Sequence, residues 1–89
     1  MAGNNRKIKR DPLDQELLDK IGARLRFFRK EKGFTNYEKF ANNHNLSRSQ
    51  IGQYEKGQNM NLTSLGSILR ALGVSWKEFF GEGFDEDQA

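Results

Sequence analysis

The chain has no cysteine and only one histidine, His44, among its 89 residues. The absence of cysteine excludes disulfides and thiolate metal sites, and a single histidine excludes a metal site built on a histidine pair. No apolar run approaches the roughly 20 residues that a membrane-spanning helix needs. We therefore expect a soluble, cytoplasmic protein that binds no metal and does not enter a membrane.

Two further absences narrow the class of protein. β-branched residues are few, and no segment alternates polar and apolar residues over a useful length, so the sequence predicts no strand. No nucleophile–base pair stands out, and there is no glycine-rich loop of the kind that holds a phosphate. The expectation is an all-α protein that is not an enzyme and needs no cofactor.

Charge is distributed unevenly along the chain. Residues 1–57 contain 13 Lys or Arg against 7 Asp or Glu, whereas residues 58–89 contain 2 against 5. The net charge of the whole chain is +3. A basic half of this kind is typical of proteins that face a polyanion, and an uneven distribution by chance in a short chain is the alternative.

Composition divides the chain into three parts. Residues 1–10 have almost no apolar side chains and are predicted to form a flexible basic arm. Residues 11–81 have the apolar periodicity of a folded domain. Residues 82–89 are acidic and are predicted to form a flexible tail. The charges of the arm are Arg6, Lys7, Lys9 and Arg10.

The first predicted helix runs from Pro12 to about Lys32. Asp11 is a typical N-cap before a proline at the first helical position, and Gly33 is a typical terminating residue. Gly22 lowers the helix propensity inside this segment and would allow close packing or a change of direction there. The apolar face recurs at steps of four and three and consists of Leu13, Leu17, Ile21, Leu25 and Phe28.

Four shorter helices are predicted after the first. A Ser or Thr stands three residues before Glu or Gln at Thr35, Ser47 and Ser75, and each of these capping boxes marks a helix start. Asn61 marks one more start. The expected helices span about 36–43, 48–55, 62–72 and 76–80. The side chains expected to be buried in the first three of them are Phe40, Ala41, Ile51, Tyr54, Leu62, Leu65, Ile68, Leu69 and Leu72.

The stretch from residue 37 to residue 56 has the pattern of a helix-turn-helix. Ala41 is a small residue across which a second helix can pack. Asn45 stands where the chain must turn sharply, and asparagine is the non-glycine residue that best tolerates a left-handed backbone. Leu46 would then close the turn, and Ser47 would cap the second helix.

The outer face of the helix at 48–55 has side chains suited to reading bases. Arginine can donate two hydrogen bonds to guanine, glutamine can bond adenine through both of its polar atoms, and serine can donate or accept. Residues near the start of a reading helix reach furthest into the major groove. Arg48, Ser49 and Gln53 are therefore candidate base contacts, and an ordinary solvated helix face is the alternative.

At this point the chain resembles a known family. It is similar to the lambda-repressor-like, XRE-type helix-turn-helix family of phage and bacterial regulators, over roughly residues 18–80. The segments that carry the resemblance are IGARLRFFRKEKGFT at 21–35, the pair Phe40-Ala41, LSRSQIGQYEKG at 46–57 and LGSILRALGVSWKEFF at 65–80.

The resemblance implies a compact five-helix domain in which the second and third helices form the DNA-reading unit. By position, Arg48, Ser49 and Gln53 match the base-contacting residues of the family. Glu55 matches an acidic residue that pairs with an arginine of the first helix, which in this chain is Arg29. We therefore expect an Arg29–Glu55 salt bridge that locks the first helix to the third.

One departure from the family concerns its phosphate contact. From Gly33 to Ala41 this chain has one residue more than the usual spacing, and the glutamine that holds a phosphate in the family is absent. Counting back from Ala41 places Tyr37 there, whereas counting forward from Gly33 places Asn36 there, so both stay candidates. The other phosphate candidates are Lys56, Asn59, Asn61 and the basic arm at 6–10, for which a purely solubilising role is the alternative.

The function expected from these features is that of a sequence-specific regulator of transcription, most simply a repressor, which binds double-stranded DNA. A homodimer on a palindromic operator is expected from operator symmetry and from the habit of the family. The dimer surface is predicted at Trp76, Phe79 and Phe80, unless these aromatic side chains complete the monomer's own core. The alternative is an antitoxin-like or regulatory module whose main partner is another protein, such as a toxin.

Overall fold

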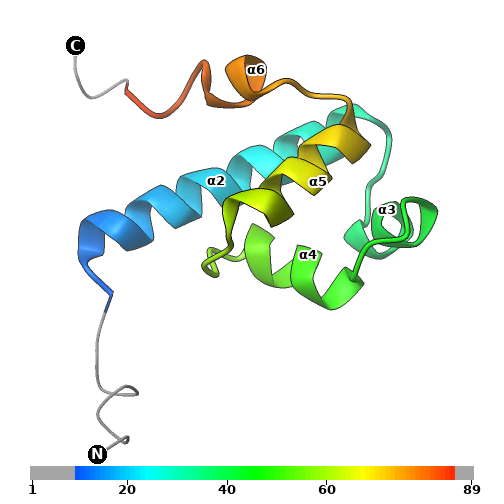
Figure 1. The fold of residues 1–89 in the computed structure, drawn as a ribbon, viewed down its shortest axis with the longest axis horizontal. Coiled ribbons are helices and arrows are strands. Elements are labelled where there is room, and N and C mark those ends of the chain that lie inside the picture. The colour runs from blue at the N-terminus through cyan, green and yellow to red at the C-terminus, as the bar shows by residue number, and fades with distance from the viewer. Residues whose placement is uncertain (1–9, 86–89) are drawn as a thin grey trace, which may run out of the picture.

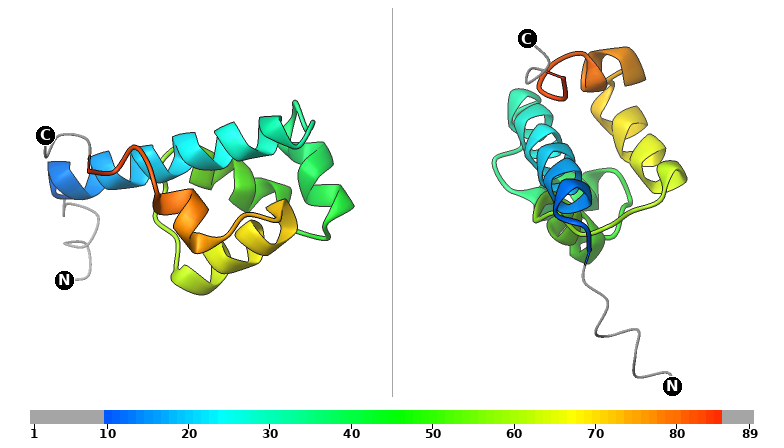
Figure 2. Two further views of the ribbon diagram at one scale, coloured as in Figure 1. Left: turned by 90° about the horizontal axis from the view of Figure 1, so that it is seen from above. Right: turned by 90° about the vertical axis from the view of Figure 1, so that its left-hand side faces the viewer.

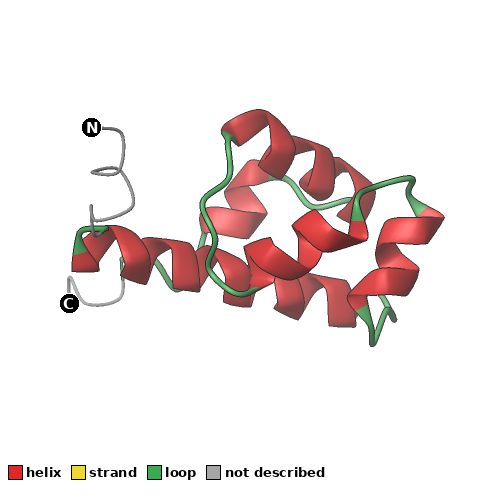
Figure 3. Cartoon of the chain, turned by 90° about the horizontal axis from the view of Figure 1, so that it is seen from below, coloured by secondary structure: helices red, strands yellow, loops and turns green. Residues whose placement is uncertain are grey.

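The computed structural model describes residues 10–85 of the chain. Helices follow one another through short loops, and no strand occurs in this range (Figure 3). The helices are α2 (Pro12–Glu31), α3 (Tyr37–Asn43), α4 (Arg48–Glu55), α5 (Leu62–Leu72) and α6 (Trp76–Phe80), shown in Figure 1. The predicted all-α fold is confirmed, and every predicted helix is present with bounds that differ by at most one residue. The predictions made for Arg6, Lys7, Lys9 and residues 86–89 lie outside the described residues.

Side-chain caps set the start of each helix. In each case a side-chain oxygen accepts a hydrogen bond from a backbone N–H in the first turn, and the caps are Asp11, Asn36, Ser47, Asn61 and Ser75. The prediction that Thr35 caps the second predicted helix is wrong, because Asn36 Oδ1 accepts from the Lys39 N–H at 2.9 Å. The physical reason is the backbone of Asn36, which is extended with φ of −135° and ψ of 138°, so the first helical residue is Tyr37 and Asn36 is the residue at the cap.

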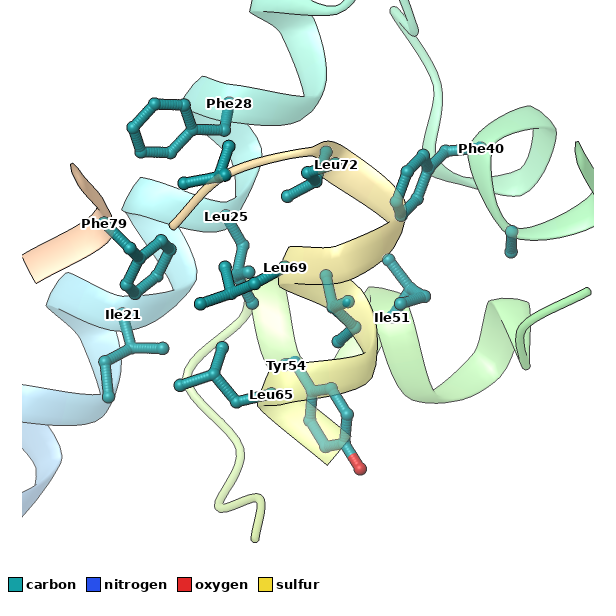
Figure 4. Packing of buried hydrophobic residues seen from close by; sticks show 13 residues of the cluster. Ile21, Leu25, Phe28, Phe40, Ile51, Tyr54, Leu65, Leu69, Leu72 and Phe79 are labelled. Atoms are coloured by element: carbon teal, nitrogen blue, oxygen red, sulfur yellow. The ribbon is translucent and has the colours of Figure 1, made fainter. Parts of the chain in front are cut away.

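The core lies where α2, α5 and α6 meet the α3–α4 pair (Figure 4). Its most deeply buried large side chains are at most 2% exposed, and they are Leu25, Phe40, Leu65, Leu69, Leu72 and Phe79. Burial of each such side chain contributes about 1.5–3 kcal/mol to folding. Because Phe79 is fully buried, it belongs to the core of the monomer, which is the alternative that the sequence left open for this residue.

Three leucines that the sequence predicted to face the core are exposed instead. Leu13 is 73% exposed, Leu17 is 46% exposed and Leu62 is 72% exposed. For the first two, the reason is that the first turns of α2 extend past α4 and α5 (Figure 2). The inward position at this end of α2 is taken by Leu18, which is 8% exposed. Between residues 10 and 85, no helix is both long enough and apolar enough to cross a membrane.

Arg24 of α2 forms hydrogen bonds with the backbone of α6. Arg24 Nε donates to the Phe79 carbonyl and Arg24 Nη2 donates to the Glu78 carbonyl, both at 3.3 Å. The guanidinium group also lies 4.7 Å from the centre of the Phe28 ring, within the range of a cation–π contact. Arg24 therefore satisfies carbonyls at the C-terminal end of α6, where intrahelical partners are missing.

Packing continues past the predicted end of the domain at residue 81. The Phe84 ring lies 4.9 Å from the Phe80 ring and 6.2 Å from the Phe79 ring, measured between ring centres. Phe84 is half-buried and contacts the core, and the chain around it runs back along the first turns of α2 (Figure 2). Aromatic contact thus holds the start of the segment that the sequence assigned to an acidic tail.

Candidate nucleic-acid interface

The turn between α3 and α4 has the backbone conformation that the sequence predicts. Asn45 adopts a left-handed conformation with φ of 58°, the only positive φ of a non-glycine residue between residues 10 and 85. The Leu46 N–H donates to the Ala41 carbonyl at 2.8 Å, which closes the turn. Ala41 is completely buried and Leu46 packs against the core. A small residue in α3, a left-handed turn and an apolar side chain after the turn therefore set the angle between the two helices.

A buried ion pair fixes α4 against α2. Arg29 Nε donates to Glu55 Oε2 at 2.7 Å and Arg29 Nη2 donates to Glu55 Oε1 at 2.8 Å, so the predicted salt bridge is present and bidentate. Arg29 is 4% exposed and Glu55 is 8% exposed. Arg29 Nη1 also donates to the Phe34 carbonyl at 2.7 Å, which ties the loop before α3 to the same group. The pair therefore holds the C-terminal end of α4 against α2, and Arg29 links the loop before α3 to the same junction.

Close approach of the backbones completes the junction of α2 with α4. A Cβ atom added at Gly22 would stand 2.6 Å from the Tyr54 carbonyl oxygen and 2.7 Å from the Glu55 carbonyl oxygen. Only glycine fits at position 22, because any other residue would bring a Cβ atom this close to the carbonyl oxygens. The glycine is there for close packing, which is one of the two roles that the sequence left open.

The face of α4 that points away from the core carries exposed polar side chains beside Gly52. Arg48 and Ser49 occupy the first two positions of the helix, directly after the cap at Ser47, and Gln53 follows one turn later. All three are exposed, as is Lys56 at the C-cap. The structure thus brings the three predicted base contacts together on one side of a helix that the core and the Arg29–Glu55 pair hold rigidly.

The two residues between which the sequence left the phosphate contact open lie at the start of α3. Asn36 is the N-cap of this helix and Tyr37 is its first residue. The Tyr37 ring reaches across to α4 and lies against Gly52. The sequence analysis did not predict this contact. A glycine on the outer face of a helix is nevertheless a signal, because it leaves room for a side chain or a backbone segment to approach the helix closely.

The asparagines among the predicted phosphate contacts each bond the local backbone, Asn36 and Asn61 as helix caps and Asn59 with the next residue along the chain. Asn36, Asn59 and Asn61 each use the side-chain oxygen to accept a backbone N–H at 2.8–2.9 Å. The side-chain NH₂ group of each remains as a donor. Arg10, the one predicted arm residue that the structure describes, donates to Gln15 and lines a shallow surface pocket together with Asn59. Arg10 and the loop after α4 therefore lie on the same side of the molecule.

Comparison with known proteins identifies the domain. A family model described as Helix-turn-helix matches residues 25–79, which is more than half of the chain. Searches of curated proteins and of solved structures gave no significant match. The matched range includes α3, α4, the turn between them and the Arg29–Glu55 pair. The chain therefore belongs to the lambda-repressor-like helix-turn-helix family of DNA-binding proteins.

Proposed function

We propose that this protein is a sequence-specific regulator of transcription, acting as a repressor, which reads double-stranded DNA by inserting α4 into the major groove. The observation that carries the proposal is the exposed polar face of α4 on a helix whose opposite face is fully engaged with the core. Arg48 and Gln53 have the side chains that bond guanine and adenine in two places, and Ser49 adds a donor or acceptor. These three residues select the sequence in this mechanism.

Phosphate contacts position the domain on the duplex. The candidates are Asn36, Tyr37, Lys56, Asn59, Asn61 and, on the arm, Arg6, Lys7, Lys9 and Arg10. The side-chain NH₂ groups of the asparagines and the exposed ammonium group of Lys56 supply hydrogen bonds to phosphate oxygens without reading bases. Asn36 caps the start of α3, Lys56 is the C-cap of α4, Asn61 caps the start of α5, and Asn59 lies in the loop between α4 and α5.

A homodimer would place two copies of α4 in successive major grooves about 34 Å apart. Trp76 is 47% exposed and Phe80 is 37% exposed, and their rings are stacked in parallel. These two side chains are the part of the predicted dimer surface that the monomer leaves open. An inverted-repeat operator follows from this two-fold arrangement.

A second candidate function is that of an antitoxin-like module whose main partner is another protein. The exposed Leu13 and Leu17 in the first turns of α2 favour it, because contiguous exposed apolar side chains often mark contacts with proteins. The two functions differ in what α4 does, since a protein-binding module needs no discrimination between DNA sequences.

Selection of binding sites from random duplex DNA, followed by titration at two salt concentrations, separates the two functions. A regulator recovers an inverted repeat, and its affinity for that repeat falls steeply as salt rises. Recovery of no common motif would contradict the proposal and would direct attention to the protein-binding alternative.

The contribution of Lys56 can be measured on its own. Lys56→Ala is expected to weaken binding to all duplexes about equally and to lower the salt slope by about one unit, because one phosphate contact is lost. The matched control is Lys77→Ala, since Lys77 lies on α6 at the opposite side of the molecule from α4 (Figure 1). An equal change in slope for both variants would show that Lys56 acts only through net charge.

A further inference from the structure

A glutamine side chain attaches the loop that follows α4 to the first turns of α2 (Figure 1). Gln15 Nε2 donates to the Gly57 carbonyl at 3.1 Å and to Asp19 Oδ1 at 2.9 Å, which uses both hydrogens of the amide. Gln15 Oε1 accepts a hydrogen bond from the Arg10 guanidinium group. Both polar atoms of the amide are therefore engaged, and the bond to Gly57 joins residues that are 42 positions apart in the sequence.

The backbone of Gly57 is fitted to this contact. Gly57 is buried and adopts a left-handed conformation with φ of 92°. The Gln58 N–H donates to the Gln53 carbonyl at 3.0 Å, as in the Schellman motif that ends many helices. A Cβ atom added at Gly57 would lie 2.9 Å from Gln15 Nε2 and would also overlap the Asp19 carboxylate. A larger residue at this position would therefore push the end of α4 away from α2.

Two separate contacts thus anchor the chain on both sides of Lys56. The Arg29–Glu55 pair holds the residue before it, and Gln15 holds the residue after it. Lys56 itself is exposed at the C-cap of α4. Gln15 lies in the part of α2 that precedes residue 25, where the family match begins. The second anchor therefore comes from turns of α2 that lie outside the matched range.

We propose that Gln15 is a positioning residue for DNA recognition, which acts through the Gly57 backbone and holds the loop after α4 in the conformation that binds DNA. The proposal rests on the function proposed above. A flexible loop would lose conformational freedom when DNA binds, and this loss costs free energy of binding. The bond from Gln15 restricts the loop before DNA arrives, so the cost is reduced. Gln15 also bonds Arg10, so the residue at which the arm joins the domain is held at the same place.

Gln15→Met tests this role, because it removes both donors of the amide and keeps an uncharged side chain of similar length. On the duplex recovered by site selection, the variant is expected to bind roughly three- to tenfold more weakly, the range found for residues that act on a site through a neighbour. In the free protein, NMR order parameters of the Gly57 and Gln58 N–H groups are expected to fall from about 0.85, typical of rigid backbone, towards about 0.6. In the complex with the duplex they are expected to rise again.

The control for an effect on stability alone is Val74→Ala, which removes two methyl groups from the core between α5 and α6. This variant is expected to lower the melting temperature at least as much as Gln15→Met does, because truncation of a buried side chain leaves a cavity. Affinity is measured at a temperature where all three proteins are folded. Under this condition Val74→Ala is expected to bind the selected duplex within twofold of the parent and to leave the order parameters of Gly57 and Gln58 unchanged.

The outcomes separate this role from the wider function. A parent chain that selects a duplex to which Gln15→Met binds equally well overturns the positioning role and leaves the proposed function intact. Weaker binding by Gln15→Met without a change in the order parameters of Gly57 and Gln58 also overturns it, because the loop would not be what Gln15 acts on. An equal loss of affinity in Val74→Ala would show that stability alone is responsible. A parent chain that selects no duplex overturns both proposals.

Discussion

Glu55→Ala is expected to destabilise the protein by about 3–5 kcal/mol, because it leaves the charge of Arg29 buried without a partner. Arg29 is 4% exposed, so water cannot replace the two hydrogen bonds that Glu55 accepts. Arg26 also approaches Glu55, at 3.6 Å, but it is half-exposed and would add only a second cation. A loss of this size is a large fraction of the 5–15 kcal/mol typical of a whole domain. The change in the free energy of unfolding is measured by urea denaturation, with circular dichroism as the signal.

The matched control is Glu38→Ala, which removes an exposed glutamate from the first turn of α3. Surface changes of this kind stay within about 0.5 kcal/mol. Replacement of the whole pair, by Arg29→Met with Glu55→Leu, is expected to cost less than Glu55→Ala alone, because no unpaired charge remains. If Glu55→Ala proved as mild as Glu38→Ala, the ion pair would not be what holds α4 to α2.

Gly22→Ala is expected to destabilise the protein by about 1–3 kcal/mol, the usual effect of overfilling a tight contact. The added methyl group would meet carbonyl oxygens of Tyr54 and Glu55 at 2.6–2.7 Å, and backbone atoms cannot swing aside as side chains can. The two helices must separate, so α4 shifts relative to the rest of the domain. We expect weaker binding to the selected duplex as well as a lower unfolding midpoint in urea.

Gly66→Ala is the control for this substitution, because Gly66 is also buried inside a helix. Its added methyl group would meet a carbon of the Trp76 side chain at 3.3 Å, and this side chain is half-exposed and free to yield. Alanine gains up to about 1 kcal/mol of helix propensity over glycine, so Gly66→Ala is expected to be neutral or stabilising. Equal destabilisation by both changes would mean that the close contact at Gly22 has no special role.

Local signals in the sequence predicted most of the fold. Caps at Ser47 and Ser75, the left-handed turn at Asn45 and the terminating glycines depend on a few neighbouring residues, so they can be recognised without the structure. The Arg29–Glu55 pair spans 26 residues, and only resemblance to the family indicated it. Positions of Arg48, Ser49 and Gln53 on one exposed face followed from helix periodicity alone.

The features that the sequence did not predict are those that depend on how separate elements pack against one another. Periodicity placed Leu13 and Leu17 on the apolar face of α2, but it does not reveal that this end of the helix extends past its neighbours. The contact of Tyr37 with Gly52 depends on the crossing of α3 and α4 and on one inserted residue. Phe84 lay in an acidic segment whose composition predicted a free tail, yet a single aromatic ring suffices to hold its beginning.

The most direct test of the central claim, that α4 reads bases, is the ratio of affinities for the selected duplex and for an unrelated duplex of equal length. For the parent chain and for Arg48→Ala with Gln53→Ala, this ratio is measured at one fixed salt concentration. Loss of base contacts is expected to cost about 1–3 kcal/mol each on the selected duplex and to lower binding to the unrelated duplex far less, so the ratio collapses. If the variant kept the ratio of the parent, recognition would not come from α4, and the account of this interface would be wrong.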